Sequence, residues 1–186
     1  MPNPGPRDRY GAVAQLFHWV IAALIVNQFV LGRLGQGLPL GLHKLILLAR
    51  HKSFGMTVLM LAVLRLLWRL FNAPPPLPDT MTPLEKCIAR ATHAAFYLLL
   101  FAMPLTGWMM SSAKNYSVSW FGVFTWPNLI GPSHAAFNLL RDTHVVLGNV
   151  LVAVALLHIA AALKHHFWNK DDVLRRMLPS VKRERS

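Results

Sequence analysis

The 186-residue sequence has a single cysteine and few charged residues. Cys87 alone excludes an intramolecular disulfide, a cysteine-based zinc site, an iron–sulfur cluster and the C-x-x-C-H attachment of c-type haem. Only 14% of the residues are charged while 54% are hydrophobic, a balance that argues against a soluble globular protein. Acidic residues are fewer than basic residues, 7 against 19. In so apolar a chain, the net charge of +12 indicates contact with membrane lipid rather than with nucleic acid.

Long stretches without charged residues are the most informative feature of the sequence. Three of them reach at least 21 residues, which is enough for a helix that crosses the membrane: 10–32, 91–113 and 143–163. A fourth stretch, 53–71, is apolar except for Arg65 and Arg69, whose side chains can extend to the lipid headgroups. We therefore predict an all-α protein that forms one domain over residues 1–186. It should be an integral membrane four-helix bundle with spans at about 12–32, 52–71, 91–112 and 143–166.

The basic residues predict the orientation of these spans. The first span is too long for a secretion signal and no small-residue cleavage site follows it, so we expect it to remain in the mature protein. Four spans place both termini on one side, which holds 13 basic residues against 6 on the other. The 13 basic residues are Arg7, Arg9, Arg65, Arg69, Lys86, Arg90 and seven residues of the C-terminal tail. Because cytoplasmic loops are enriched in Lys and Arg, both termini are predicted to be cytoplasmic.

The connections between spans differ in composition. The inner connection, 72–83, contains Pro74-Pro75-Pro76 and is too rich in proline to be helical. The outer connection, 114–141, carries four aromatic residues of the kind that settle at a membrane interface: Trp120, Phe121, Phe124 and Trp126.

Nine histidines carry most of the chemical information. An imidazole inside a membrane span is costly, so each one is either a helix–helix hydrogen bond or a ligand. His18 and His158 fall on the inner halves of the first and fourth spans, whereas His51 and His144 open the second and fourth spans at the outer side. These four residues therefore form two pairs, each at one depth.

Two pairs of nitrogen ligands at two depths favour two flat metal cofactors, each held from opposite faces by histidines on different helices. Zinc would need further donors, and a transport pathway would be expected to carry carboxylates, which the apolar stretches lack. Small residues follow all four histidines, including Gly55 after His51 and Gly148 after His144. They would let a porphyrin lie against the helix, but such residues also simply promote close helix packing.

The other five histidines are assigned by position. His93 and His165 lie at the inner side, where each is either a quinone contact or an interfacial polar residue. His43 and His134 are predicted to lie in outer loops, and with His166 to be solvated or to face the headgroups.

Several motifs resemble those of the prokaryotic cytochrome b561 family. They cover nearly the whole chain: Phe17-His18-Trp19, His51-Lys52-Ser53-Phe54-Gly55, Arg65-Leu66-Leu67-Trp68-Arg69, His93 through Pro104-Leu105-Thr106-Gly107-Trp108, and His144 through His165-His166-Phe167-Trp168. The resemblance implies a four-helix membrane cytochrome with two non-covalent b haems that passes electrons between the outer surface and membrane quinone. It places the axial ligands on His18, His51, His144 and His158, the same set that the depths select.

Basic residues beside the outer histidines suggest two further roles. Arg50, Lys52 and Arg141 could pair with haem propionates or contact lipid headgroups. The excess of basic over acidic residues on the outer side would also attract a small anionic electron donor such as superoxide.

At the inner side, a quinone site is predicted between the start of the third span and the end of the fourth. His93 and His165 would be its hydrogen-bond partners, because an imidazole near the aqueous boundary can deliver the protons that quinone reduction takes up. Lys86 and Arg90 would stabilise negative charge that develops on the quinone oxygen.

The combined expectation is an electron carrier of the bacterial inner membrane that oxidises a periplasmic donor, either a small anion or a protein, and reduces ubiquinone. Some members of the family it resembles are superoxide:ubiquinone oxidoreductases, which makes that enzymatic activity one possible use. A second possible use is that of a cytochrome b anchor subunit of a larger oxidoreductase such as a hydrogenase. An alternative from another class is a haemless histidine-containing membrane transporter.

Overall fold

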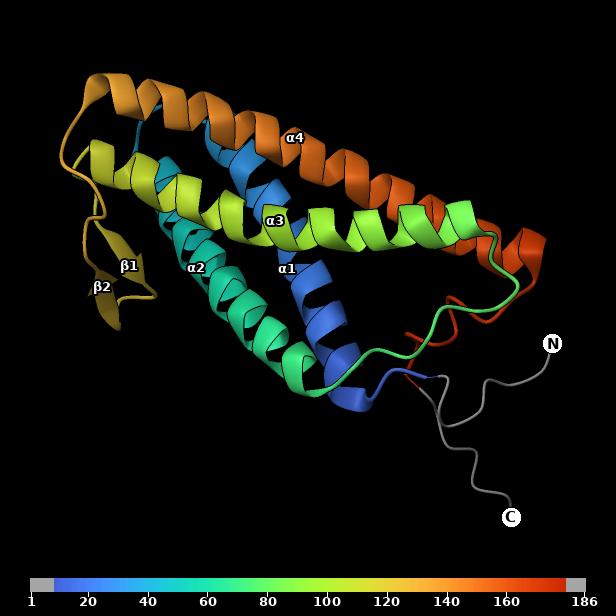
Figure 1. The fold of residues 1–186 in the computed structure, drawn as a ribbon. Coiled ribbons are helices and arrows are strands. Elements are labelled where there is room, and N and C mark those ends of the chain that lie inside the picture. The colour runs from blue at the N-terminus through green and yellow to red at the C-terminus, as the bar shows by residue number, and fades with distance from the viewer. Residues whose placement is uncertain (1–8, 180–186) are drawn as a thin grey trace, which may run out of the picture.

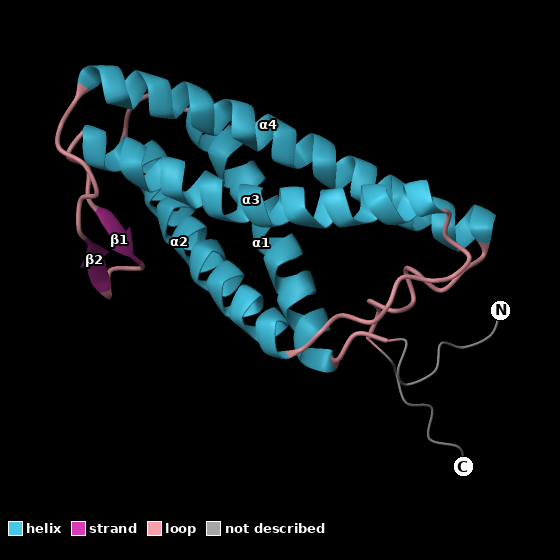
Figure 2. Cartoon of the chain, viewed as in Figure 1, coloured by secondary structure: helices cyan, strands magenta, loops and turns pink. Residues whose placement is uncertain are grey.

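The computed structural model describes residues 9–179 and consists of four long α-helices with a small β-hairpin (Figure 2). The helices are α1 (Ala12–Gly37), α2 (Leu42–Phe71), α3 (Pro83–Ala113) and α4 (His134–Lys164). Each is long and apolar enough to cross a membrane. The prediction of an all-α, four-helix membrane protein is therefore confirmed. Arg7 and the last basic residues of the C-terminal tail, which entered the charge count, lie outside the described residues.

Local sequence explains where α3 and α4 begin. Thr82 caps α3 by accepting a hydrogen bond from the backbone of Glu85, whose carboxylate accepts one from the backbone of Thr82 in return. Pro83 then occupies the first helical position, where its missing N–H costs nothing. Ser133 caps α4 through the backbone N–H of Ala136. The proline-rich segment before Thr82 is not helical, as predicted.

The helices extend beyond the predicted spans. α2 begins at Leu42 rather than near residue 52, and α4 begins at His134 rather than near residue 143. The assignment of His43 and His134 to outer loops is therefore wrong, because both lie in the first turn of a helix. Charge-free length measures only the part of a helix inside the hydrocarbon, whereas a helix can continue through the headgroup layer with charged side chains attached.

A β-hairpin fills part of the outer connection between α3 and α4. Strand β1 (Val118–Trp120) pairs antiparallel with β2 (Phe124–Trp126). The turn uses Phe121 and Gly122, both with positive φ, as hairpin turns require. The hairpin is fixed to α2 because the indole of Trp120 donates to the Thr57 hydroxyl at 3.0 Å.

The helices pack as two pairs, α1 against α2 and α3 against α4, with α2 also contacting α3 (Figure 1). The main apolar core comes from α1, α2 and α3, at Ile21, Val58, Ala62 and Leu100. Within the described chain, α4 packs closely against α3 but not against α1 or α2. Side chains rather than closely packed backbones therefore join α4 to the first two helices. The outer surfaces of the helices carry large exposed apolar side chains that suit contact with lipid.

After α4, a π-helical turn (His165–Asn169) leads into a segment that folds back under the bundle. We call this segment, residues 170–179, the C-terminal strap. It is tied to the start of α1, because the backbone N–H of Tyr10 donates to Arg176 O at 3.2 Å and the Trp19 indole donates to Met177 O at 2.9 Å. The beginning of α1 and the end of α4 therefore lie at the same end of the molecule.

Candidate functional site

Two pairs of histidine rings face one another between α4 and the first two helices. His18 of α1 and His158 of α4 have ring centroids 6.3 Å apart, and His51 of α2 and His144 of α4 have centroids 6.2 Å apart. The structure thus brings together the same pairs that the sequence matched by depth. Each pair joins two helices whose backbones do not pack closely, so the imidazoles bridge these helices.

The separation of the rings suits one metal ion per pair. A metal–imidazole bond is about 2 Å long and the ring nitrogen lies about 1 Å from the ring centre, so two imidazoles on opposite sides of one ion have centroids about 6 Å apart. No group of three or more His, Cys, Asp or Glu side chains able to hold a metal ion occurs among residues 9–179. A metal held here by two nitrogens needs its remaining ligands from elsewhere, as a porphyrin supplies them. The paired histidines therefore fit haem and do not fit a zinc site.

One histidine of the outer pair has a hydrogen-bond partner that fixes its proton. Thr106 Oγ1 lies 3.1 Å from Nδ1 of His144, and also 2.8 Å from Ala102 O and 2.9 Å from Met103 O. The hydroxyl proton goes to a carbonyl, so the hydroxyl oxygen accepts the proton on Nδ1. The other ring nitrogen, Nε2, then keeps its lone pair for a metal.

The partner histidine is held differently. The side-chain amide of Gln28 donates to the backbone oxygen of His51 at 2.9 Å and fixes that turn of α2 against α1. The Nδ1 atom of His51 itself is shielded from solvent and has no hydrogen-bond partner within the described chain. In the outer pair, therefore, His144 is the ring whose Nδ1 atom is bound by a neighbouring side chain of the described residues.

Two glycines let other helices approach the outer histidines. A Cβ atom at Gly107 would lie 3.1 Å from Cε1 of His144, and one at Gly32 would lie 3.4 Å from Cε1 of His51. Sequence reasoning missed both residues, because each lies on a different helix from the histidine it faces.

The glycines that the sequence pattern selected have other neighbours. A Cβ atom at Gly55 would meet the Gln28 amide at 2.8 Å, and one at Gly148 would meet the methyl group of Met103 at 3.5 Å. Their observed role is close helix packing, which was the second interpretation of the pattern.

A third imidazole stands at the inner pair. The ring of His93 lies 6.0 Å from that of His158, and Phe96 packs against His158 at 5.3 Å. His93 thus contacts the inner pair directly, which its position in the sequence did not reveal. By distance alone, His158 could share a metal with either His18 or His93.

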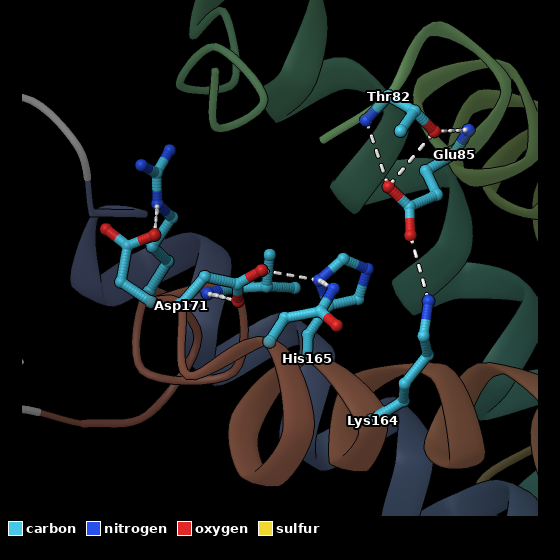
Figure 3. Close-up of polar contacts among 9 residues, drawn as sticks. Thr82, Glu85, Lys164, His165 and Asp171 are labelled. Carbon is cyan, nitrogen blue, oxygen red and sulfur yellow. Dashed lines mark hydrogen bonds and ion pairs between the residues drawn. The ribbon is translucent and has the colours of Figure 1, made fainter. Parts of the chain in front are cut away.

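His165, by contrast, is not near His93. Lys164 pairs with Glu85 at 2.9 Å, so these two residues share a depth (Figure 3). His93 lies eight residues further along α3, about 12 Å deeper in the bundle, whereas His165 directly follows Lys164. His165 is buried against Asp171 of the C-terminal strap, with its Nδ1 atom 2.5 Å from the carboxylate.

The predicted cationic contacts are partly engaged within the protein. Lys52 donates to the backbone oxygen of Ser117 at 3.3 Å, and Lys86 lies 3.8 Å from the exposed carboxylate of Asp79. Arg50 and Arg90 are exposed. Arg141 is paired at 2.9 Å with Asp142, so its charge is already balanced.

Comparison with known proteins agrees with this geometry. A family model described as prokaryotic cytochrome b561 matches residues 9–180. Cytochrome b561 homolog 2 of Escherichia coli (strain K12) is 38% identical over 175 residues, which are 92% of each chain. A probable superoxide oxidase, CybB, of Yersinia pestis is 28% identical over 92% of this chain and 96% of its own. A cytochrome b562 of Cereibacter sphaeroides is 26% identical over 87% of this chain and 89% of its own.

Proposed function

Because the chain belongs to the prokaryotic cytochrome b561 family, we propose that it is a dihaem cytochrome b. In this role it transfers electrons between a periplasmic donor and ubiquinone in the bacterial inner membrane. The observation that carries the proposal is the pair of imidazole couples, each spaced for one metal ion, that join α4 to α1 and α2. Their centres lie at two depths, as a path for electrons across a membrane requires.

His18 with His158, and His51 with His144, would hold the two b haems. Haem iron held in this way exchanges single electrons. Because two imidazoles would hold each haem, the site would supply electron exchange and would not bind oxygen or another substrate. The protein's own contribution is to hold the rings: the hydroxyl of Thr106 fixes the proton of His144 on Nδ1.

At the outer end, the proposed donor is a small anion such as superoxide. The relative from Yersinia pestis that is named a probable superoxide oxidase supports this choice. Arg50 is exposed there with no acidic partner in the described chain, and Lys52 is only partly exposed. Such charges raise the local concentration of an anion and speed its encounter with the protein.

At the inner end, the proposed quinone site centres on His93. Its ring contacts that of His158, so a quinone beside it would lie close to the inner ligand pair. Arg90 and Lys86, about one and two turns nearer the surface on the same helix, would stabilise negative charge on the quinone oxygen. His165 with Asp171 forms a buried acid–base pair between this region and the aqueous boundary, and we assign to it the supply of protons.

A reduced-minus-oxidised visible spectrum of the purified protein tests the haem assignment. We expect two b-type components that can be separated by potential. His51→Ala should remove mainly one component and His158→Ala mainly the other, whereas His43→Ala, an exposed change in the first turn of α2, should remove neither. A colourless protein would favour the haemless transporter, and identical losses from His51→Ala and His158→Ala would contradict the pairing.

Two further measurements test the partners and the orientation. Reduction of ubiquinone by superoxide, with the isolated chain as catalyst, would show that the protein works alone, whereas inactivity of a fully haem-loaded chain would favour an anchor subunit. A reporter that is active only in the periplasm should be silent when fused after Ser186. Activity of that fusion would reverse the topology.

A further inference from the structure

A cavity of about 410 Å³ lies at the end of the bundle that carries the start of α1 and the end of α2. Its walls come from the first turn of α1, the last turns of α2, Tyr97 of α3 and the proline-rich connection. Met177 of the C-terminal strap closes one side, and its backbone is held in place by the indole of Trp19. We call it the arginine cavity, because three arginines line it: Arg9, Arg65 and Arg69.

No acidic residue of the described chain balances these arginines. The cavity lining contains neither Asp nor Glu. All five carboxylates of residues 9–179 contact other basic side chains: Asp79 with Lys86, Glu85 with Lys164, Asp142 with Arg141, Asp171 with His165, and Asp172 with Arg176. Three positive charges therefore face one space without a protein counter-ion in this part of the chain.

The arginines are also partly removed from water. Arg9 and Arg65 are half-buried, and Nε of Arg9 is shielded from solvent and has no hydrogen-bond partner within residues 9–179. Burial raises the pKa of the neighbouring Tyr10 hydroxyl above its usual value of 10.0, even though Arg69 and Arg65 oppose that rise. Arg69 is exposed, and the Arg9 guanidinium donates through Nη2 to Arg175 O at 3.2 Å. The chain thus engages only part of the three guanidinium groups, and their remaining N–H groups can donate to an anion from outside the chain.

The guanidinium groups are held in position by an aromatic ring. Arg65 and Arg69 both lie over Tyr97, at 5.9 Å and 5.4 Å from its centroid. Stacking of this kind fixes the plane of a guanidinium and leaves its edge free to donate to a phosphate or carboxylate. The rest of the lining includes Trp68 and Pro75, which suit the apolar part of a ligand.

We propose that the arginine cavity binds the phosphate headgroup of an anionic phospholipid such as phosphatidylglycerol. The cavity lies where α1 begins and α2 ends, the level at which membrane helices meet the headgroup layer. Basic pockets between membrane helices at this level bind anionic lipid headgroups. Phe71, which is 86% exposed at the end of α2, and Leu67 offer an apolar surface beside the cavity for the acyl chains. The negatively charged headgroup would then contact α1, α2, α3 and the C-terminal strap at the same time.

Native mass spectrometry of the whole protein released from vesicles tests the proposal. The vesicles contain equal amounts of phosphatidylglycerol and phosphatidylcholine. A parallel sample uses phosphatidylcholine vesicles with added inorganic phosphate. We expect one retained phosphatidylglycerol per chain in preference to phosphatidylcholine, and no retained phosphate in the parallel sample. Arg9→Gln and Arg69→Gln should each lower the retained fraction by about fivefold, the effect of one basic residue near a membrane surface.

Matched variants complete the test. Arg69→Lys keeps the charge and should retain most of the lipid, and Arg33→Gln removes an exposed arginine at the other end and should change nothing. Equal retention of the two lipids, or unchanged retention in Arg9→Gln and Arg69→Gln, would overturn the proposal. Retention of inorganic phosphate would replace the lipid by a free anion. If Arg69→Gln lost haem absorbance while it kept the lipid preference, the arginines would serve haem propionates instead, whereas the proposed electron transfer would stand.

Discussion

The hydrogen bond between Thr106 and His144 predicts a selective effect on one of the two proposed haems, the one that His144 would hold. Thr106→Val keeps the shape of the side chain and removes the oxygen that lies 3.1 Å from Nδ1 of His144. The ring N–H would then be left without a partner in an apolar environment, which costs about 1–3 kcal/mol. That range matches the 10- to 100-fold loss of metal affinity that follows when an outer-shell partner of a ligating histidine is removed.

The change should also alter the potential of the outer haem. A hydrogen bond from Nδ1–H makes the imidazole more basic, which favours the oxidised metal, so Thr106→Val should raise the midpoint potential. If the bond favours the oxidised form tenfold over the reduced form, the rise is about 59 mV for one electron. The potential of the inner haem should stay where it is, because Thr106 contacts neither His18 nor His158.

Spectroelectrochemical titration of the purified protein measures both potentials and the haem content together. Thr106→Ser keeps the hydroxyl and should behave like the wild type. Thr57→Val removes a hydroxyl that accepts from Trp120 and should leave both potentials unchanged. If Thr106→Val left haem content and both potentials at the wild-type values, the bond would not support a ligand, and the role of His144 would have to be reconsidered.

Two further predictions follow from local geometry. Gly107→Ala places a Cβ atom 3.1 Å from Cε1 of His144, so the ring must move by a few tenths of an ångström; we expect reduced outer-haem occupancy by visible spectroscopy, whereas Gly148→Ala, which meets only a flexible methionine end at 3.5 Å, should keep it. Asp171→Asn weakens a buried hydrogen bond to His165 and should lower the free energy of unfolding by about 1–3 kcal/mol. Asp142→Asn, at an exposed pair, should cost no more than about 1 kcal/mol. A shift in thermal midpoint for Asp171→Asn no larger than that for Asp142→Asn would contradict the assigned role of the strap.

The sequence predicted the depth of each histidine in the membrane well, because depth depends only on the position of the residue along its span. The thickness of the hydrocarbon sets the length of a charge-free stretch, so the position of His18 or His144 along its span is a position across the membrane. Two histidines at one depth can meet only if their helices face one another, and the need to satisfy costly buried imidazoles makes that arrangement favourable. The ring distances of 6.3 Å and 6.2 Å agree with this reasoning.

The lateral arrangement of the helices could not be predicted in the same way. Which helix stands beside a histidine depends on side-chain packing between segments that are distant in the sequence. The contacts of Gly32 and Gly107 with the outer rings, and of His93 with His158, belong to this class. For Thr106, the sequence indicates a hydrogen bond, because a hydroxyl inside an apolar stretch needs a partner. It does not indicate which residue that partner is.

The burial of His165 was missed for a related reason. Nothing in the apolar pattern of the fourth span indicates that the chain reverses after it, since the reversal depends on Lys170 in a left-handed conformation and on bonds to the start of α1. The strap places Asp171 against His165 and converts a residue that looked interfacial into a buried one. Contacts between the two ends of a chain are the hardest to infer from local patterns.

The surroundings of the two imidazole pairs differ, and the difference matches the two reactions proposed for them. The outer pair is fixed by Thr106 and by a glycine at close range, and in the described chain it has no third imidazole beside it. Rigid ligands suit simple electron uptake, because a metal site that does not rearrange between oxidation states transfers electrons quickly. The inner pair has His93 in ring contact, a group that can hold or release a proton. Quinone needs protons together with electrons and superoxide oxidation releases none, so the spare imidazole lies at the end where proton transfer is required.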